Sequence, residues 1–375
     1  MKKVMLVFGT RPEAIKLCPL VIELRKHQDA FDTVVCVTAQ HRQMLDQFLN
    51  IFEVIPDYDL DIMKEQQTLF DITSRVLTET NRVLTKEKPD VVIVQGDTTT
   101  TFAVSLCAYY NKVSVGHVEA GLRTGNKYSP FPEEMNRKLT GAIADIHFAP
   151  TKWAKNNLLA ENIPEEKIIV TGNTVIDALL SVRKKIQTNC KDYRTLFSGI
   201  DLRKRTILVT GHRRENFGQA FINFCTALKT LACKYPDIEI VYPVHFNPNV
   251  RKPVNDILKK VVNIKLIEPL DYEPFIYLMD KCYFIITDSG GIQEEAPSFG
   301  KPVLVTRDTT ERPEAVDAGA AKLVGTDKDI IILEAERLLN DSKHYGKMSN
   351  VQNPFGDGKA CERIIERLFR FFRET

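Results

Sequence analysis

Short runs of apolar and β-branched residues alternate with longer amphipathic stretches along nearly the whole chain. In the first half these runs predict strands at residues 3–8, 33–38, 90–95, 113–118 and 146–149. The intervals predict helices at residues 12–26, 41–50, 68–88, 98–110 and 134–144. Continuous apolar strands separated by helices are typical of a parallel sheet covered on both faces. This half is therefore predicted to be a doubly wound α/β domain.

The pattern breaks over residues 181–204, which are rich in lysine, arginine, glutamine and asparagine. A second series of strands is predicted at residues 206–210, 238–242, 263–267, 283–287 and 302–305, and a last helix at 358–372. We therefore expect two Rossmann-like doubly wound domains facing a cleft. The first comprises residues 1–170 with the returning segment 358–375, and the second comprises residues 171–357.

Composition excludes several classes of protein. In this chain of 375 residues, 51 basic side chains nearly balance 49 acidic ones, giving a net charge of +2. This near-equal balance of charges disfavours a protein that binds nucleic acid mainly through attraction to its phosphates. No apolar stretch approaches the roughly 20 residues of a membrane span. The eight cysteines are scattered, which favours reduced thiols over disulfides and a cytoplasmic location.

Two loops that follow strands have the chemistry of anion-binding sites. Residues 8–16 place Arg11 and Lys16 at the start of a helix, and a helix N-terminus with two cations suits a phosphorylated ligand. Residues 287–295 bring Ser289, Gly290 and Gly291 to a second helix start, with Glu295 about a turn further on. Neither loop has a dinucleotide or P-loop signature. Surface cations and a plain tight turn remain the alternative interpretations.

Carboxylates also gather after strands of the first domain. Asp97, Glu119, Glu133 and Glu134 are the candidates, and several acids at one site suit general acid–base catalysis. For Asp97 the alternative is a helix N-cap. Glu119 stands in an apolar setting and needs a partner, for which Arg123 is a candidate.

Two histidines follow strands of the second domain, and two others lie within strands of the first. His212 and His245 follow strands of the second domain, and His212 precedes Arg213 and Arg214, which favours an anionic ligand. His117 and His147 lie within apolar strands and are interpreted as core residues. The acidic run at residues 57–61 lacks the glycine and glutamate of a calcium loop, and no metal site is predicted.

The longer motifs, taken in order, closely resemble the non-hydrolysing UDP-N-acetylglucosamine 2-epimerases of bacteria. They are FGTRPEA (8–14), TAQHR (38–42), GDTTT (96–100), GHVEAGLRT (116–124), PEE (132–134), GHRREN (211–216), TDSGGIQEEAP (287–297), RDTTERPE (307–314) and NPFGDG (353–358). The resemblance implies a glycosyltransferase-B-like fold. It also implies reversible epimerisation at C2 of UDP-N-acetylglucosamine, giving UDP-N-acetylmannosamine for cell-surface polysaccharide synthesis without a cofactor. The implied route eliminates UDP to a 2-acetamidoglucal and then adds UDP back.

The resemblance also implies roles for individual residues. The implied catalytic set is Asp97, Glu119, Glu133 and His212; the implied UDP-binding set is Arg11, Lys16, Phe275, Ser289, Gly290, Gly291, Glu295 and Arg312. A second substrate molecule would act as an activator at Gln40, Gln43, Arg213 and His245, and Glu133 fits this pocket as an alternative. Gln66 stands where some relatives have arginine, which leaves activation open. A homodimer is also implied.

Three other functions remain open from the sequence. A hydrolysing 2-epimerase would release free N-acetylmannosamine and UDP. A glycosyltransferase would use the same fold and donor but would need an acceptor groove, and it gives the dense acid set no evident role. A non-catalytic nucleotide-sugar sensor is disfavoured because all four candidate catalytic residues are present.

Overall fold

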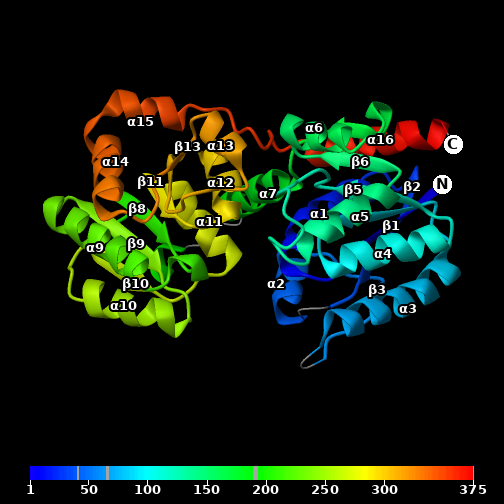
Figure 1. The fold of residues 1–375 in the computed structure, drawn as a ribbon, viewed down its shortest axis with the longest axis horizontal. Helices are drawn as coiled ribbons and strands as arrows, with labels where there is room; N and C mark the ends of the chain where they lie inside the picture. Colours follow the sequence, from blue (N-terminus) through cyan, green and yellow to red (C-terminus); the bar gives the residue numbers. More distant parts are fainter. Residues whose placement is uncertain (40–41, 65–66, 189–192, 375) are drawn as a thin grey trace. The chain divides into compact units, whose positions relative to one another are not determined.

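The computed structural model describes residues 1–39, 42–64, 67–188 and 193–374, which form two compact units. The first unit contains Met1–Ser181 and Phe355–Thr375, and the second contains Val182–Pro354. The sequence placed the boundary at residue 170, whereas the units divide within helix α7 (Thr174–Thr188). Each unit is an α/β structure built around one parallel sheet (Figure 1).

The sheet of the first unit has, within the described residues, seven strands in the order β3-β2-β1-β4-β5-β6-β7, all paired in parallel. Its strands are β1 (Lys2–Phe8), β2 (Phe31–Val37), β3 (Tyr58–Asp59), β4 (Val91–Gln95), β5 (Ser114–Val118), β6 (Ile146–Ala149) and β7 (Ile168–Val170). The five predicted strands are confirmed with small shifts at their ends. The sequence missed β3 and β7, which are too short to show a period.

Helices cover both faces of this sheet. They are α1 (Arg11–Arg25), α2 (Arg42–Phe52), α3 (Leu69–Glu87), α4 (Thr99–Tyr110), α5 (Glu133–Ile143), α6 (Lys152–Ala160), α7 and α16 (Ala360–Glu374). Helix α1 packs against α2 and α16, while α4 packs against α3 and α5 (Figure 1). The strand order reverses between β1 and β4, so the loops that follow these two strands lie next to each other, where doubly wound folds bind ligands.

Two helix starts in this unit show how local sequence sets the geometry. Helix α1 begins with a capping box in which Thr10 and Glu13 satisfy each other's backbone donors, and Pro12 occupies its first turn. Helix α4 is capped by Thr98, whose hydroxyl accepts from the backbone N–H of Thr101 at 3.0 Å. The interpretation of Asp97 as the cap of α4 is therefore wrong by one residue, and its carboxylate is left for another partner.

The second unit contains a second parallel sheet, which has, among the described residues, six strands in the order β10-β9-β8-β11-β12-β13. They are β8 (Arg205–Thr210), β9 (Ile238–Pro243), β10 (Ile264–Ile267), β11 (Phe284–Thr287), β12 (Val303–Val305) and β13 (Ala321–Leu323). The reversal lies between β8 and β11, so the loops after these strands are neighbours. All the predicted strands are confirmed, and β13 was missed.

The helices of the second unit differ in length, from short turns to helices of several turns. They are α8 (Tyr193–Leu196), α9 (Gln219–Lys234), α10 (Pro248–Leu258), α11 (Tyr272–Lys281), α12 (Gly290–Glu295), α13 (Pro313–Asp317), α14 (Lys328–Asn340) and α15 (Ser342–Ser349). Apolar side chains of the strands and of α9, α10 and α14 form one continuous core, with Phe221, Leu228 and Tyr242 fully or almost fully buried.

The C-terminal segment belongs to the first unit. Asp177 on α7 accepts the backbone N–H groups of Ala360 at 3.2 Å and Cys361 at 2.9 Å, which anchors the start of α16. Farther along α16, Phe369 packs against Phe31 with ring centroids 4.7 Å apart. Apart from the exposed Cys233, the described cysteines are buried free thiols. Among the described helices, none is long and apolar enough to cross a membrane.

Candidate active site

A buried carboxylate joins the two loops at the reversal of the first sheet. One oxygen of Glu13 accepts the backbone N–H groups of Gly9 at 3.0 Å and Thr10 at 2.7 Å. The other oxygen accepts the hydroxyls of Thr98 at 2.7 Å and Thr101 at 3.1 Å. Burial raises the pKa of Glu13, against the lowering effect of these donors. Glu13 thus fixes the loops that carry Arg11 and Asp97. It was not among the predicted site residues, although its place three residues after Thr10 is a capping-box signal.

Glu119 occupies a strained position directly after β5. Its φ is +63°, a left-handed conformation that is uncommon for a residue with a side chain. Its carboxylate accepts from the ammonium group of Lys16 at 2.6 Å, from the amide of Asn173 at 3.1 Å and from Gln95. The partner expected from sequence was Arg123, but the structure gives that role to Lys16. Arg123 instead forms a bidentate pair with Glu161, at 2.8 and 2.6 Å.

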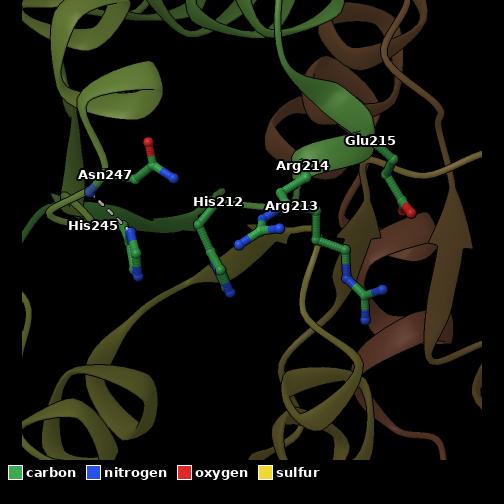
Figure 2. A pocket seen from close by; sticks show the side chains of 6 residues that line it. All are labelled: His212, Arg213, Arg214, Glu215, His245 and Asn247. Carbon is green, nitrogen blue, oxygen red and sulfur yellow. Dashed lines mark hydrogen bonds between the residues drawn. The ribbon is translucent and has the colours of Figure 1, made fainter. Parts of the chain in front are cut away.

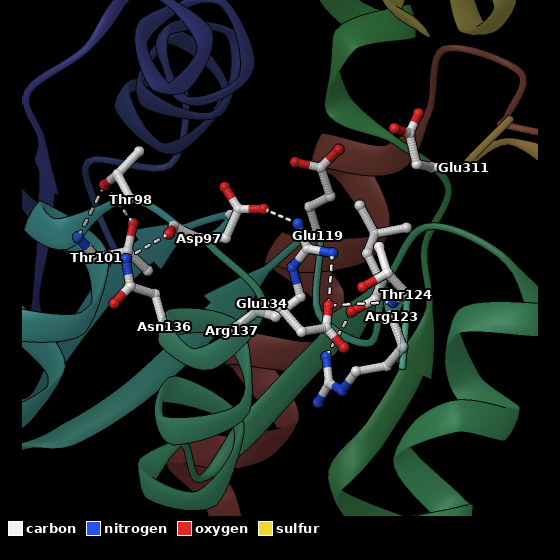
Figure 3. Close-up of polar contacts among 12 residues, drawn as sticks. Asp97, Thr98, Thr101, Glu119, Arg123, Thr124, Glu134, Asn136, Arg137 and Glu311 are labelled. Atoms are coloured by element: carbon white, nitrogen blue, oxygen red, sulfur yellow. Dashed lines mark hydrogen bonds and ion pairs between the residues drawn. The ribbon is translucent and has the colours of Figure 1, made fainter. Parts of the chain in front are cut away.

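Asp97 is held by residues that the sequence did not single out. Its carboxylate pairs with Arg137 of α5, and its backbone carbonyl accepts from the Asn136 amide at 2.9 Å (Figure 3). The Asp97 side chain remains 28% exposed, against 5% for Glu119. One carboxylate is therefore accessible to a ligand, while the other lies deeper beside an ammonium group.

The two adjacent glutamates at the start of α5 have different environments. Glu134 is fully buried and accepts from the backbone N–H groups of Thr124 at 3.1 Å and Gly125 at 3.0 Å. Glu134 also pairs with Arg137 at 3.1 Å (Figure 3). It therefore supports both the loop after β5 and Arg137, the residue that pairs with Asp97. Glu133 is half-buried, and within the described residues its Oε2 has no hydrogen-bond partner. Of this pair, Glu133 is the one with an oxygen left for a ligand.

In the second unit, the loop after β8 is fixed from two sides. The carbonyl of Gly211 accepts from the buried hydroxyl of Tyr242 at 2.8 Å. The backbone N–H groups of His212 and Arg213 both donate to one oxygen of Asp288, each at 2.8 Å. Asp288 follows β11 and is 1% exposed. The sequence motif contained Asp288, but its role as a buried acceptor emerges only from the adjacency of β8 and β11.

This loop borders a hollow of about 460 Å³, lined by His212, Arg213, Arg214, Glu215, His245 and Asn247 (Figure 2). The rings of His212 and His245 stack with centroids 5.3 Å apart and planes 16° apart. Burial and the neighbouring His212 lower the pKa of His245, against an opposing effect of Asp288. The structure thus brings together the predicted residues His212, Arg213 and His245.

The loop after β11 depends on a glycine. A Cβ placed on Gly290 would lie 2.9 Å from the guanidinium of Arg312, closer than any ordinary contact, so this arginine packs directly on the glycine backbone. Arg312 donates to Glu294 at 2.8 Å, and Glu295 accepts from the Tyr272 hydroxyl at 2.9 Å. A Cβ on Gly291 would meet open space. The predicted residues Ser289, Gly290, Gly291, Glu295 and Arg312 therefore lie together.

The remaining predicted residues are more dispersed. Arg11 is exposed at the start of α1, and its guanidinium lies 5.4 Å from the Phe48 ring. Phe275 is half-buried on α11. Gln43 lies in α2, with its side chain outside the described part of the structure, and Gln40 and Gln66 lie outside it altogether.

The two strand histidines are core residues, as expected. His117 is fully buried, and its Nε2 lies 2.7 Å from the carbonyl oxygen of Gly96. Burial lowers the pKa of His117 to about 3 and that of His147 to about 4. Both rings are therefore neutral at physiological pH. One of them, His117, contacts the backbone carbonyl of Gly96, directly before Asp97.

Two Rossmann-like parallel sheets, each with polar side chains at the carboxyl ends of its central strands, place the chain in the glycosyltransferase-B-like class of α/β proteins. The model of the UDP-N-acetylglucosamine 2-epimerase family matches residues 23–369. The UDP-N-acetylglucosamine 2-epimerase of Escherichia coli K12 is 58% identical over 369 residues, covering 98% of each chain. The chain therefore belongs to the UDP-N-acetylglucosamine 2-epimerase family.

Solved structures give the same result. The Neisseria meningitidis UDP-GlcNAc 2-epimerase bound to UDP-GlcNAc is 54% identical with a TM-score of 0.90, covering 98% of this chain and 100% of that one. The Methanocaldococcus jannaschii enzyme in complex with UDP-GlcNAc and UDP is 40% identical with a TM-score of 0.80, covering 98% and 99%. The family predicted from the motifs is confirmed at the level of UDP-N-acetylglucosamine 2-epimerases, and the non-hydrolysing type stays a prediction.

Proposed function

We propose that the chain is a non-hydrolysing epimerase that interconverts UDP-N-acetylglucosamine and UDP-N-acetylmannosamine. The observation that carries this proposal is the pair of carboxylates at the carboxyl ends of neighbouring strands β4 and β5. Asp97 is accessible beside Arg137, and Glu119 is buried beside Lys16. Two acids in unlike environments suit a reaction in which one group removes a proton and another supplies one.

The chemistry that such a site must perform is difficult, because no carbonyl adjoins C2 and its proton is not acidic. In the proposed route a carboxylate takes the C2 proton while the C1–O bond breaks and its electron pair leaves with UDP. The C1–C2 double bond of a 2-acetamidoglucal forms at the same time. UDP then adds back to C1, and C2 receives a proton on the opposite face. No electrons are gained or lost, so the route needs no redox cofactor.

The polar loops of the second unit suit the other half of the substrate. The leaving diphosphate gains negative charge as the C1–O bond breaks, and donors aimed at that charge lower the barrier. His212 and Arg312 can supply cationic or polar donors near the loop of Ser289, Gly290 and Gly291, and we assign Glu295 to the ribose. We assign UDP to these residues together with Arg11, Lys16 and Phe275. Two relatives of this chain have been solved with UDP-GlcNAc, one of them also with UDP.

The hollow beside His212 suits an additional anionic ligand. We propose that a second UDP-N-acetylglucosamine acts there as an activator, in contact with Arg213 and His245 and with Gln40, Gln43 and Glu133. Among these, Arg213 and His245 line the hollow. The active form is proposed to be a homodimer.

The test is incubation of the full chain with UDP-N-acetylglucosamine, followed by separation of sugar nucleotides and free sugars. The proposal predicts an equilibrium mixture of two UDP-sugars with the total UDP-sugar unchanged. Release of free N-acetylmannosamine and UDP in equal amounts would establish the hydrolysing reaction instead. Turnover only after addition of a sugar acceptor would indicate a glycosyltransferase.

A further inference from the structure

The buried carboxylate of Asp288 faces the His212 loop with both of its oxygens. One of its oxygens accepts both backbone N–H groups of the loop, from His212 and Arg213, at 2.8 Å each. Its other oxygen, Oδ1, is buried, has no hydrogen-bond partner within the described residues, and lies 3.6 Å from Nδ1 of the His212 ring. At that distance the two atoms are too far apart for a hydrogen bond, and they form an ion pair only when the ring is protonated.

The geometry of the ring limits what this contact does. A carboxylate is only an acceptor when ionised, so an Nδ1 atom that faces it is favoured when it carries a proton. With Nδ1 protonated, the ring donates from Nε2 only as the imidazolium. A face of the ring also stacks on His245, with the ring centroids 5.3 Å apart, and two adjacent imidazolium rings would repel each other. A single positive charge on this pair is therefore favoured on the ring next to Asp288.

We propose that Asp288 is the positioning residue of His212: one oxygen fixes the loop backbone, and the other holds a proton on Nδ1, so that the second proton taken up by the ring lies on Nε2, where it is available to an anionic ligand. The other charged groups around the hollow are Arg213, Arg214, Glu215 and His245. Arg213 is itself paired with Glu311 at 3.9 Å. The inference rests on the proposed function only in naming a diphosphate as the anion.

The first test uses the wild-type chain and needs no activity. The ring nitrogens of the seven histidines are followed by ¹⁵N NMR across pH 5–9, and His212 is assigned by the loss of its signals in His212→Gln. We expect the neutral His212 ring to be the Nδ1–H tautomer, in contrast to the Nε2–H tautomer that an unconstrained ring prefers. A neutral His212 that carries its proton on Nε2 would overturn the proposal.

The second test compares Asp288→Asn with a matched control. Asp177→Asn makes the same change at a half-buried carboxylate in the first unit that also accepts two backbone N–H groups. We expect Asp288→Asn to move the His212 titration to lower pH by about one unit, and Asp177→Asn to leave it unchanged. UDP affinity, measured by calorimetry, should fall up to about tenfold at pH 7.5 in Asp288→Asn, and less as the pH is lowered and the ring takes up its proton in both proteins.

These readouts separate the two claims. A His212 titration that is the same in Asp288→Asn and the wild type would overturn the role of Asp288, whatever the enzyme's activity. A shifted titration with unchanged UDP binding would leave the positioning intact and contradict the assignment of the diphosphate to His212. If Asp288→Asn does not fold, the tautomer measured in the wild type decides the question.

Discussion

The ammonium group of Lys16 lies 2.6 Å from both carboxylate oxygens of Glu119. The two residues come from the first turns of α1 and from the end of β5, and both are largely buried. A cation at this distance favours the ionised carboxylate. Lys16, which the resemblance assigns to UDP, therefore also lies where its charge favours the ionised form of Glu119, the form that the proposed mechanism requires of a base.

Replacement of Lys16 tests this relationship. Lys16→Met keeps most of the side-chain volume but removes the charge, so Glu119 becomes harder to ionise. We expect the acidic limb of the kcat/KM–pH profile to move to higher pH by one unit or more, on the order of the effect of an adjacent charge. Lys3→Met is the control, because Lys3 pairs with Glu87 at 2.8 Å at the other end of the sheet. A Lys16→Met profile that coincides with the wild type would contradict the role of the pair.

Asp97 and Glu119 are expected to transfer protons. Asp97→Asn and Glu119→Gln preserve the shape of each side chain but remove this capacity, and each should lower kcat roughly 10²–10⁴-fold. Since Thr98 caps α4, Asp97→Asn should fold normally. Asp90→Asn, at the amino end of β4, is the matched control and should keep its activity. Normal turnover in both site variants would remove these residues from the mechanism.

Glu133→Gln separates two interpretations of the third acid. A catalytic Glu133 would lose kcat at every substrate concentration, as Asp97 does. A Glu133 that contacts an activating second substrate would instead lose only the sigmoidal dependence of rate on UDP-N-acetylglucosamine. Steady-state kinetics over a wide range of substrate concentration distinguishes these outcomes.

The buried His117 ring makes the first unit sensitive to acid. Its pKa is lowered by burial to about 3, while the unfolded chain titrates near 6.5, so between these values the unfolded state binds the additional proton. Stability is therefore retained above pH 6.5 and lost as the pH falls toward 3. Between pH 7 and 4.5 the loss from this group is about 2.5 kcal/mol. Urea denaturation at several pH values should show a weaker pH dependence in His117→Gln, and an identical slope would contradict this explanation.

Glu311 gives the second unit a different acid response. Burial raises its pKa, but hydrogen bonds from Arg307 and the charges of Arg312, Arg307 and Arg213 prevail and lower it to about 2. A lowered carboxylate pKa stabilises the fold above the unfolded value near 4.5, and this contribution is lost as the pH falls toward 2. Because the side chain is partly exposed, we expect Glu311→Gln to cost roughly 1 kcal/mol at pH 7. The difference from wild type, measured by urea denaturation, should shrink below pH 4.5.

The fold could be predicted from sequence because its signals are local. The apolar runs of β1, β4, β8 and β11 are long enough to identify parallel strands, and glycine or proline follows most of them. The strands β3, β7 and β13 were missed because two or three residues show no period. These short strands form because they add to the edge of a sheet that the longer strands have already built.

The candidate site was predictable only in part. Residues directly after strands could be found, since parallel strands present their carboxyl ends at one edge. Their partners could not, because Lys16 and Glu119, or Arg137 and Asp97, are far apart in sequence and meet only when the strand order is known. Arg123, four residues from Glu119, was a reasonable partner by proximity in sequence. In the structure it pairs with Glu161 instead.

The most direct measurement of the proposed mechanism is the reaction of UDP-N-acetylglucosamine in heavy water, with the products followed by NMR and mass spectrometry. Elimination and re-addition pass the C2 proton through a carboxyl group that exchanges with solvent. We predict that the UDP-N-acetylmannosamine formed carries solvent deuterium at C2. In Glu119→Gln, both turnover and the incorporation of deuterium at C2 should be lost. Epimerised UDP-sugar that retains its original hydrogen at C2 would contradict the proposed mechanism.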